Sequence, residues 1–178
     1  NQAQLPRIGQ FNDWFRDSIK GSTFNLHDRG YALENEHYYD SAKQVIAGSI
    51  GVEKKDKGLF LQPNQSVNYV ESHDNHTLWD KLKVCEWNDS EEWLKKRHRL
   101  ATCMVLLSQG IPFLHSGQEF FRTKQGMGNS YRASDEINQL DWDACMTNKE
   151  HVDYIKGIIE IRKSHRAFRF PNAELIRR

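Results

Sequence analysis

Short strand-like runs alternate with helical patterns along this chain of 178 residues, and that alternation constrains its fold more than any other feature. The predicted strands cover residues 7–11, 67–71 and 111–115. Strands that alternate with helices are typical of parallel βαβ units, so we expect an α/β fold in which these strands lie parallel. Three strands cannot close a barrel, which takes about eight.

Capping residues and apolar spacing predict the helices. The first begins after Asn12 or Asp13 and is ended by Gly21. The second is the strongest pattern in the chain, because Asp89 or Ser90 can cap it, acidic residues follow at once, and apolar residues recur at helical spacing as far as Gly110.

A last helix is predicted over residues 149–164, where a stripe of isoleucines is expected to face the core. Residues 116–142 are polar, contain glycine and read as a long loop. Between residues 22 and 61 the periodicity is weak, and one short helix near the apolar cluster 45–50 is the most that it supports.

Composition removes several classes of function. Lysine plus arginine total 25 and aspartate plus glutamate 24, and no basic run is interleaved with aromatics, so nucleic acid is not an expected partner. No apolar stretch approaches the roughly 18 residues that span a bilayer, so no membrane is expected either. The start, N-Q-A-Q-L-P, carries neither a methionine nor a signal-peptide pattern, and we expect a chain excerpted from something longer.

The cysteines carry little chemistry. Cys85, Cys103 and Cys145 form no CxxC pair, so neither a zinc site nor a redox motif is indicated. Leftover thiols are disfavoured in oxidising compartments, which leans towards a cytoplasmic protein and leaves secretion open.

One segment invites a chemical interpretation. Residues 70–80 read V-E-S-H-D-N-H-T-L-W-D, and they place His73 and Asp74 where the second predicted strand gives way to a loop. Catalytic groups of barrel enzymes lie at the carboxyl ends of strands. Without further support, a His-Asp pair in a loop is more often a cap or a surface ion pair.

The same segment resembles the seventh-strand region of the pullulanase and related debranching group of the α-amylase superfamily. Four other segments match in family order. Residues 7–21, R-I-G-Q-F-N-D-W-F-R-D-S-I-K-G, are similar to the sixth strand and its helix, and residues 110–120, G-I-P-F-L-H-S-G-Q-E-F, are similar to the eighth strand. Residues 129–142, N-S-Y-R-A-S-D-E-I-N-Q-L-D-W, are similar to the loop beyond that strand, and residues 161–169, I-R-K-S-H-R-A-F-R, are similar to the close of the barrel.

The resemblance implies a partial (β/α)₈ TIM barrel. Residues 1–178 would form the C-terminal portion of a catalytic domain, namely its last three βα units with strands six to eight, and no complete second domain. In this family a retaining mechanism uses an aspartate nucleophile after the fourth strand and a glutamate general acid after the fifth. Both would be absent here, so the isolated chain is expected to be inactive.

The third carboxylate of that machinery would be Asp74, which braces the sugar in the transition state, with His73 donating to the same sugar. Asp135 and Asn138, in the loop after the last strand, are implied ligands of a neighbouring glucose unit. A turn-forming role for Asp135 competes with that assignment.

Several neighbours have plainer interpretations. His76 lies three residues after His73 but no third zinc ligand is evident, so loop packing is favoured. Trp79 could stack on a sugar or pack in the core. Glu71 is expected to pair with a neighbouring residue, while His115 and Glu119 could shape the mouth of a site.

The resemblance implies hydrolysis of α-1,6-glucosidic links in pullulan, starch or branched dextrins, with an α-glucan as partner and no cofactor. Some family members carry structural calcium, but no D-x-D-x-D-G loop is present. Rival interpretations are an isoamylase, amylase or branching enzyme, or a non-catalytic glucan-binding or structural half-barrel. Unpaired barrel edges would favour self-association.

Overall fold

A small parallel sheet lies at the centre of the computed structural model, which describes residues 5, 7–53 and 57–178. Its strands, β1 (Gln10–Phe11), β2 (Ser66–Asn68) and β3 (Ile111–Pro112), lie in the order β1-β2-β3. Both pairings are parallel, with Phe11 opposite Val67 and Val67 opposite Ile111. The predicted parallel α/β arrangement is confirmed. The expectation of an excerpted chain rests on the sequence of residues 1–6, most of which lie outside the described residues.

Each strand is shorter than predicted, because only two or three residues of each hydrogen-bond with a neighbour. The chain then turns into the loops and helices that follow. Among the described residues no helix is long and apolar enough to cross a membrane.

The predicted helices form where their caps indicate. Helix α1 (Asp13–Lys20) is capped by Asn12, whose side chain accepts from Phe15 N at 3.0 Å, and it ends at Gly21, whose φ is 88°. Helix α4 (Glu91–Leu107) is capped by Ser90. Helices α2 (Tyr39–Ile46) and α7 (Lys149–Ser164) complete the predicted set.

Helix α3 (Leu78–Cys85) was not predicted, so two helices rather than one separate β2 from β3. Its signal was local: the Thr77 hydroxyl accepts from Asp80 N at 3.1 Å as an N-cap. The remaining elements are short: η2 (Tyr31–Leu33), η3 (Glu36–Tyr38), η4 (Pro63–Gln65), η5 (Gln118–Phe120), α5 (Asp135–Asn138), α6 (Trp142–Thr147), η6 (Arg166–Phe168) and α8 (Ala173–Ile176).

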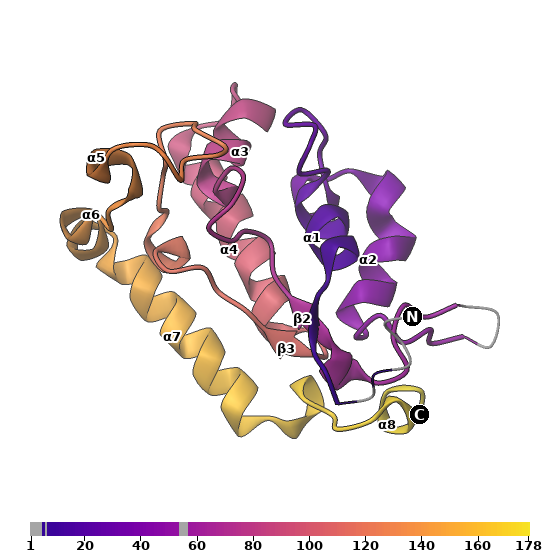
Figure 1. Cartoon of the computed structure of the whole chain (residues 1–178). Helices are drawn as coiled ribbons and strands as arrows, with labels where there is room; N and C mark the ends of the chain where they lie inside the picture. The colour runs from indigo at the N-terminus through magenta and orange to yellow at the C-terminus, as the bar shows by residue number, and fades with distance from the viewer. Residues whose placement is uncertain (1–4, 6, 54–56) are drawn as a thin grey trace.

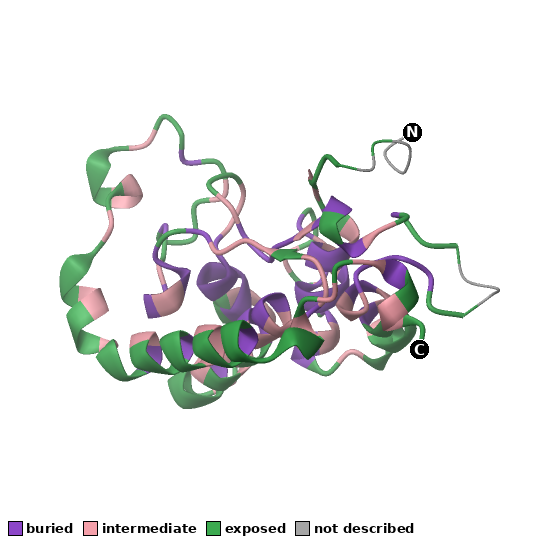
Figure 2. Ribbon diagram, turned by 90° about the horizontal axis from the view of Figure 1, so that it is seen from below, coloured by how far each residue is buried: buried purple, intermediate pink, exposed green. Residues whose placement is uncertain are grey.

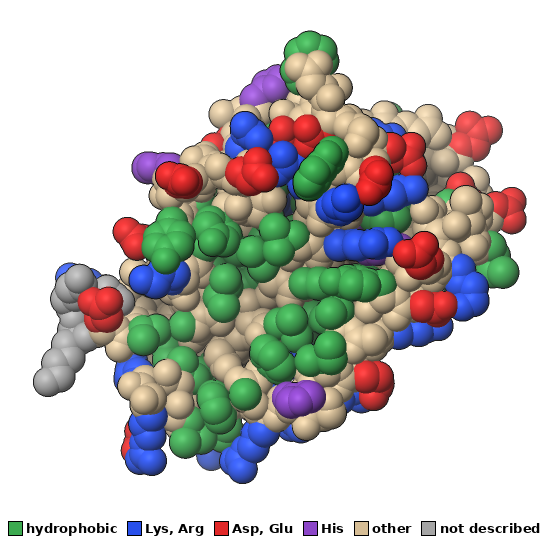
Figure 3. Space-filling model, turned by 180° about the vertical axis from the view of Figure 1, so that it is seen from behind, with side chains coloured by type: hydrophobic (Ala, Val, Ile, Leu, Met, Phe, Trp, Pro, Cys, Tyr) green, Lys and Arg blue, Asp and Glu red, His purple; other side chains and the backbone are tan. Residues whose placement is uncertain are grey.

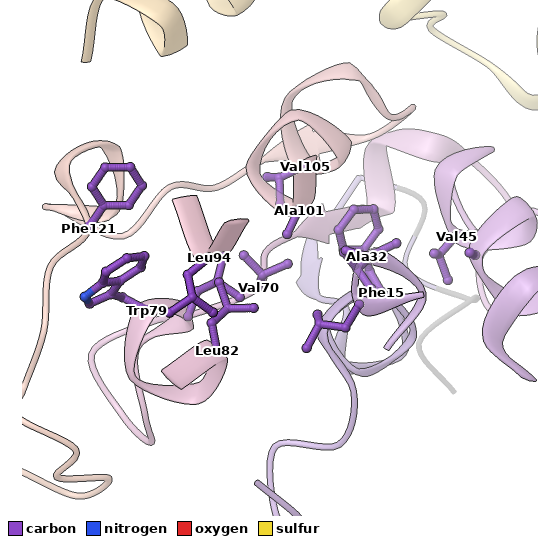
Figure 4. Close-up of a cluster of buried hydrophobic side chains, with 14 residues drawn as sticks. Phe15, Ala32, Val45, Val70, Trp79, Leu82, Leu94, Ala101, Val105 and Phe121 are labelled. Atoms are coloured by element: carbon purple, nitrogen blue, oxygen red, sulfur yellow. The ribbon is translucent and has the colours of Figure 1, made fainter. Parts of the chain in front are cut away.

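The helices follow one another around the sheet in chain order, from α1 and α2 through α3 and α4 to α7 (Figure 1). The main core lies where helices α1, α2, α3 and α4 and the segments next to them meet (Figure 4). Trp79 is 6% exposed within it, which favours core packing over sugar stacking for that residue. Its buried members are Phe15, Ile19, Ala32, Leu33, Ala42, Val45, Val70, Leu78, Trp79, Leu82, Leu94, Ala101, Val105 and Phe121.

The two faces of the sheet are covered unequally. Ser66 and Asn68 are fully buried on the face that α1 and α2 cover. On the opposite face Phe11, Val67 and Ile111 stand in one row, since residues in register on parallel strands point the same way. Phe11 is 53% and Ile111 42% exposed, so this row is an uncovered apolar face.

Helix α7 is less buried than its isoleucine stripe predicts. Ile155 is buried, but Ile161 is 42% exposed and the other isoleucines are half-buried. The reason is that α7 packs mainly against α4 and η5, and exposed residues run along much of its length (Figure 2). Seen from behind, exposed apolar side chains gather in several groups between charged ones (Figure 3).

Candidate functional site at the carboxyl edge of the sheet

The turn after β2 presents a single ionised carboxylate to solvent. His73 and Asp74 are both exposed there. The Ser72 hydroxyl donates to Asp74 Oδ1, and Asn75 Nδ2 donates to Asp74 Oδ2 at 3.2 Å. The Ser72 hydrogen bond lowers the pKa of Asp74, with smaller contributions from the charges of His73 and Arg16. The side chain is therefore oriented and negatively charged at neutral pH.

A series of hydrogen-bonded polar side chains lies next to this turn, beginning at the buried Glu71. Glu71 is 2% exposed, and its carboxylate accepts from Leu78 N at 2.5 Å and faces His115 Nδ1 at 2.9 Å. Arg122 Nη1 lies 3.2 Å from His115 Nε2. Because a guanidinium only donates, Nε2 must accept and Nδ1 must carry the proton given to Glu71. The predicted pairing of Glu71 with a neighbour is confirmed.

The loop after β3 is fastened to the same edge. Arg122 Nη2 donates to Asn138 O at 2.6 Å. Asp80, 3% exposed on α3, accepts from Thr123 Oγ1 at 2.5 Å and from Lys124 N at 2.8 Å. These bonds join α3 to a loop more than 40 residues further along the sequence.

The two predicted ligands in that loop differ in how free they are. Asp135 is exposed at the start of α5. The Asn138 side chain is engaged within its own loop, because Oδ1 accepts from Ser130 Oγ at 2.8 Å and Nδ2 donates to the carbonyls of Ser130 and Ala133 at 2.8 and 3.2 Å. Asn138 therefore shapes the loop that carries Asp135.

The remaining candidates have structural surroundings. A Cβ atom placed on Gly128 would lie 2.7 Å from His76 Cε1, so the imidazole packs tightly against this loop. Burial lowers the pKa of His76. Glu119 accepts from Gly117 N at 3.0 Å and borders a cavity of about 330 Å³ beside α7. No group of three or more His, Cys, Asp and Glu side chains in the described part of the chain could hold a metal ion.

Sequence reasoning missed Asp80, Arg122 and Lys124. Each is a charged residue in or next to a polar segment, where a solvated role is the usual expectation. Only their contacts with segments distant in the sequence distinguish them, and no local pattern in the sequence carries that information.

Comparison with known proteins agrees over the whole chain. The chain is 51% identical over 178 residues to the pullulanase of Bacillus subtilis (strain 168). The match covers 100% of this chain and 25% of that protein. It is also 32% identical to the chloroplastic pullulanase 1 of Arabidopsis thaliana, in a match that covers 79% of this chain and 19% of that protein. The chain belongs to the pullulanase family. That family lies within the α-amylase superfamily.

Solved pullulanase structures match the fold as closely. The crystal structure of pullulanase type I from Bacillus subtilis complexed with maltose superposes with a TM-score of 0.96 at 51% identity, covering 99% of this chain and 25% of that one. The pullulanase of Anoxybacillus sp. LM18-11 complexed with maltotriose gives 0.94 at 54% identity, covering 99% and 24%. No protein-family model matches the chain. This pullulanase-family chain spans about a quarter of the length of these relatives.

Proposed function

We propose that this chain is the C-terminal part of the catalytic barrel of a pullulanase-type glycoside hydrolase that cleaves α-1,6-glucosidic links in pullulan, starch or branched dextrins. The observation that carries the proposal is Asp74, an oriented, exposed carboxylate at the carboxyl edge of the sheet, in a chain similar to pullulanases from end to end. Carboxylates in that position suit barrel chemistry.

Residues 1–178 would supply strands six to eight of a (β/α)₈ barrel. Three observations support this: the strands are parallel and in sequential order, helices follow each of them, and the row Phe11, Val67 and Ile111 is an apolar sheet face without a cover. In a closed barrel such a face is filled by side chains from the other strands. The outer edges of β1 and β3 would pair with those strands.

The mechanism we propose retains the anomeric configuration, with a nucleophile and a general acid contributed by strands four and five outside this chain. Positive charge develops on the sugar ring in the transition state. The negative Asp74 would stabilise that charge and accept hydrogen bonds from the sugar hydroxyls, while His73 donates from the adjacent position. Asp74 itself would make no covalent bond.

An α-glucan is the proposed ligand. Pullulanases from Anoxybacillus were crystallised with maltotriose and with maltotetraose. We propose that Asp135 binds a second glucose unit beside the one at Asp74. Asn138 would assist there as the less direct ligand, because its amide also holds the loop together.

The first test changes Asp74 in the pullulanase that contains this chain. Asp74→Asn should lower kcat on pullulan by about a hundredfold or more, with a much smaller change in KM, since the lost interaction strengthens only in the transition state. The matched control is Asp40→Asn, an exposed aspartate on α2, which should leave kcat unchanged. Equal activity of both variants would refute the assignment.

The second test measures reducing-sugar release from pullulan by the 178-residue chain, with an intact mass taken on the same sample. We expect no turnover, because the nucleophile and the general acid are proposed to lie elsewhere. Turnover at that mass would mean that a complete catalytic site lies among the carboxylates of this chain. Release from amylose but not from pullulan by the whole enzyme would instead favour an amylase.

A further inference from the structure

Lys124, in the loop after β3, is a buried cation with every donor in use. The residue is 1% exposed. Its ammonium donates to His73 O at 3.1 Å, to Gly128 O at 2.9 Å and to Asn75 O. An ammonium group carries three N–H donors, so none is left over. Two of the three bonds reach the residues on either side of Asp74.

The lysine is also fixed at its backbone. Lys124 N donates to Asp80 Oδ2 at 2.8 Å, and the preceding Thr123 donates through Oγ1 to Asp80 Oδ1 at 2.5 Å. Asp80 belongs to α3, which begins directly after the turn. One end of Lys124 is therefore tied to the helix and the other to the turn.

The turn needs an outside support. Asn75 adopts a left-handed backbone with φ of 58°, a conformation that asparagine tolerates better than most residues other than glycine but that still costs free energy, which surrounding contacts offset. His73 and Asp74 are exposed, so little packing restrains them. Hydrogen bonds from a charged donor are stronger than neutral ones, and burial makes their loss more costly.

We propose that Lys124 is the positioning residue of the sugar site, which holds the His73–Asn75 turn so that the Asp74 carboxylate keeps one orientation. The inference rests on the proposed function for its catalytic consequence. Its structural content stands apart from it, because order in the turn can be measured without substrate. Lys124 itself touches no substrate, and it acts through the two carbonyls that flank Asp74.

The test compares Lys124→Met with Lys81→Met. Lys81 is the matched control, since it is also 1% exposed and its ammonium donates to backbone carbonyls of Ser22, Asn25 and Leu26 at 3.0, 3.1 and 3.4 Å. In the pullulanase that contains this chain, backbone ¹⁵N order parameters should stay near about 0.85 in residues 73–76 of the wild type and fall below about 0.6 in Lys124→Met. Lys81→Met should loosen residues 22–26 alone.

A second readout follows the Asp74 carboxyl group by NMR titration. In Lys124→Met the Asp74 carboxylate no longer keeps one orientation and loses the hydrogen bond from Ser72, so the pKa of Asp74 should rise towards its ordinary value. In Lys81→Met the pKa of Asp74 should stay low. If Lys124→Met does not fold, Asp80→Ala removes the carboxylate that accepts from Thr123 Oγ1 and Lys124 N, and it should loosen residues 73–76 to a smaller extent. An ordered turn in these variants overturns the proposal.

In the active enzyme, Lys124→Met should lower kcat about tenfold or more, with KM changed less than about threefold. A loosened turn with full activity would show that Lys124 positions the turn but that Asp74 is not the catalytic carboxylate, which is a failure of the proposed function. A rigid turn with reduced kcat would refute the positioning role and leave the proposed function intact.

Discussion

At the scale of single residues, His98 on α4 is buried completely, and neither ring nitrogen has a hydrogen-bond partner among the described residues. It packs between Trp79, Phe121 and His151, with ring centroids 6.2, 4.9 and 5.7 Å away. His151 on α7 accepts from Arg99 Nε at 3.0 Å through Nδ1 and stacks on Phe121. The joint between α3, α4 and α7 thus contains two imidazoles that must stay neutral.

This joint should make the fold sensitive to acid. Burial holds the pKa of His98 well below the ordinary 6.5, and burial with the nearby charges of Arg99 and Lys95 lowers the pKa of His151 to about 4. Below pH 6.5 these two histidines bind protons in the unfolded chain but remain neutral in the folded chain. The free energy of unfolding is therefore complete above pH 6.5 and should fall as the pH drops from about 6.5 to about 4, as urea titrations would measure.

A substitution separates this contribution from general acid denaturation. His98→Leu replaces one titrating side chain by an apolar one of similar size. The free energy of unfolding of this variant should therefore depend less on pH between about 6.5 and 4 than that of the wild type. His37→Leu, at an exposed position, should keep the wild-type slope. Parallel curves for all three proteins would contradict a role for His98.

At the scale of elements, helix starts are held by polar caps of unequal importance. Asn12 is fully buried, caps α1, and also donates through Nδ2 to Ser49 Oγ at 2.8 Å and Ser66 Oγ at 2.7 Å. It thereby connects α1 to β2 and to the segment after α2. Ser90 caps α4 at an exposed position, with Trp93 N at 3.3 Å, and makes no comparable connection.

The two caps predict different losses of stability. Asn12→Ala should cost about 2–4 kcal/mol of unfolding free energy, because the cap is lost and two buried hydroxyls lose a donor. Ser90→Ala should cost about 0.5–1 kcal/mol, as an exposed cap does. Urea denaturation of both variants checks the difference, and equal losses would mean that the buried connection contributes nothing.

At the scale of the whole molecule, the uncovered row Phe11, Val67 and Ile111 and the two free sheet edges are the weakest features of this chain by itself. The Phe11 ring packs edge to face on the rings of Tyr69 and Phe113, with centroids 5.0 and 5.1 Å away. Contiguous exposed apolar surface and unpaired strands favour association.

We therefore predict self-association of the isolated chain at micromolar concentration, measured by sedimentation velocity. Ile111→Lys should increase the monomer fraction, because it places a charge on the edge strand β3, at the end of the apolar row. The control is Trp93→Lys on α4, which is 55% exposed and outside the sheet, and which should not change association. A monodisperse wild-type monomer with a high melting temperature would contradict the half-barrel interpretation.

The sequence by itself determined the elements that depend on neighbours in the chain. Cap candidates at Asn12 or Asp13 and at Asp89 or Ser90, the stop at Gly21 and the apolar periodicity located α1, α4 and α7, because capping and amphipathicity are local interactions. Helix α3 was missed since its few apolar residues follow a polar turn directly. The pattern around His73 and Asp74 likewise indicated the carboxyl edge of a strand, where the structure has them.

The tertiary structure decided which polar residues are buried and what they hold. Lys124, Asp80 and Arg122 look like surface residues in the sequence, yet they fasten the loops around Asp74 to one another. Bonds such as Arg122 to Asn138, Asp80 to Lys124 and Lys124 to His73 span 16, 44 and 51 residues, and hydrogen bonds across such separations leave no periodic trace. Burial is a property of the packed whole, because it depends on which distant segments come together, and so the support of the site became visible only in three dimensions.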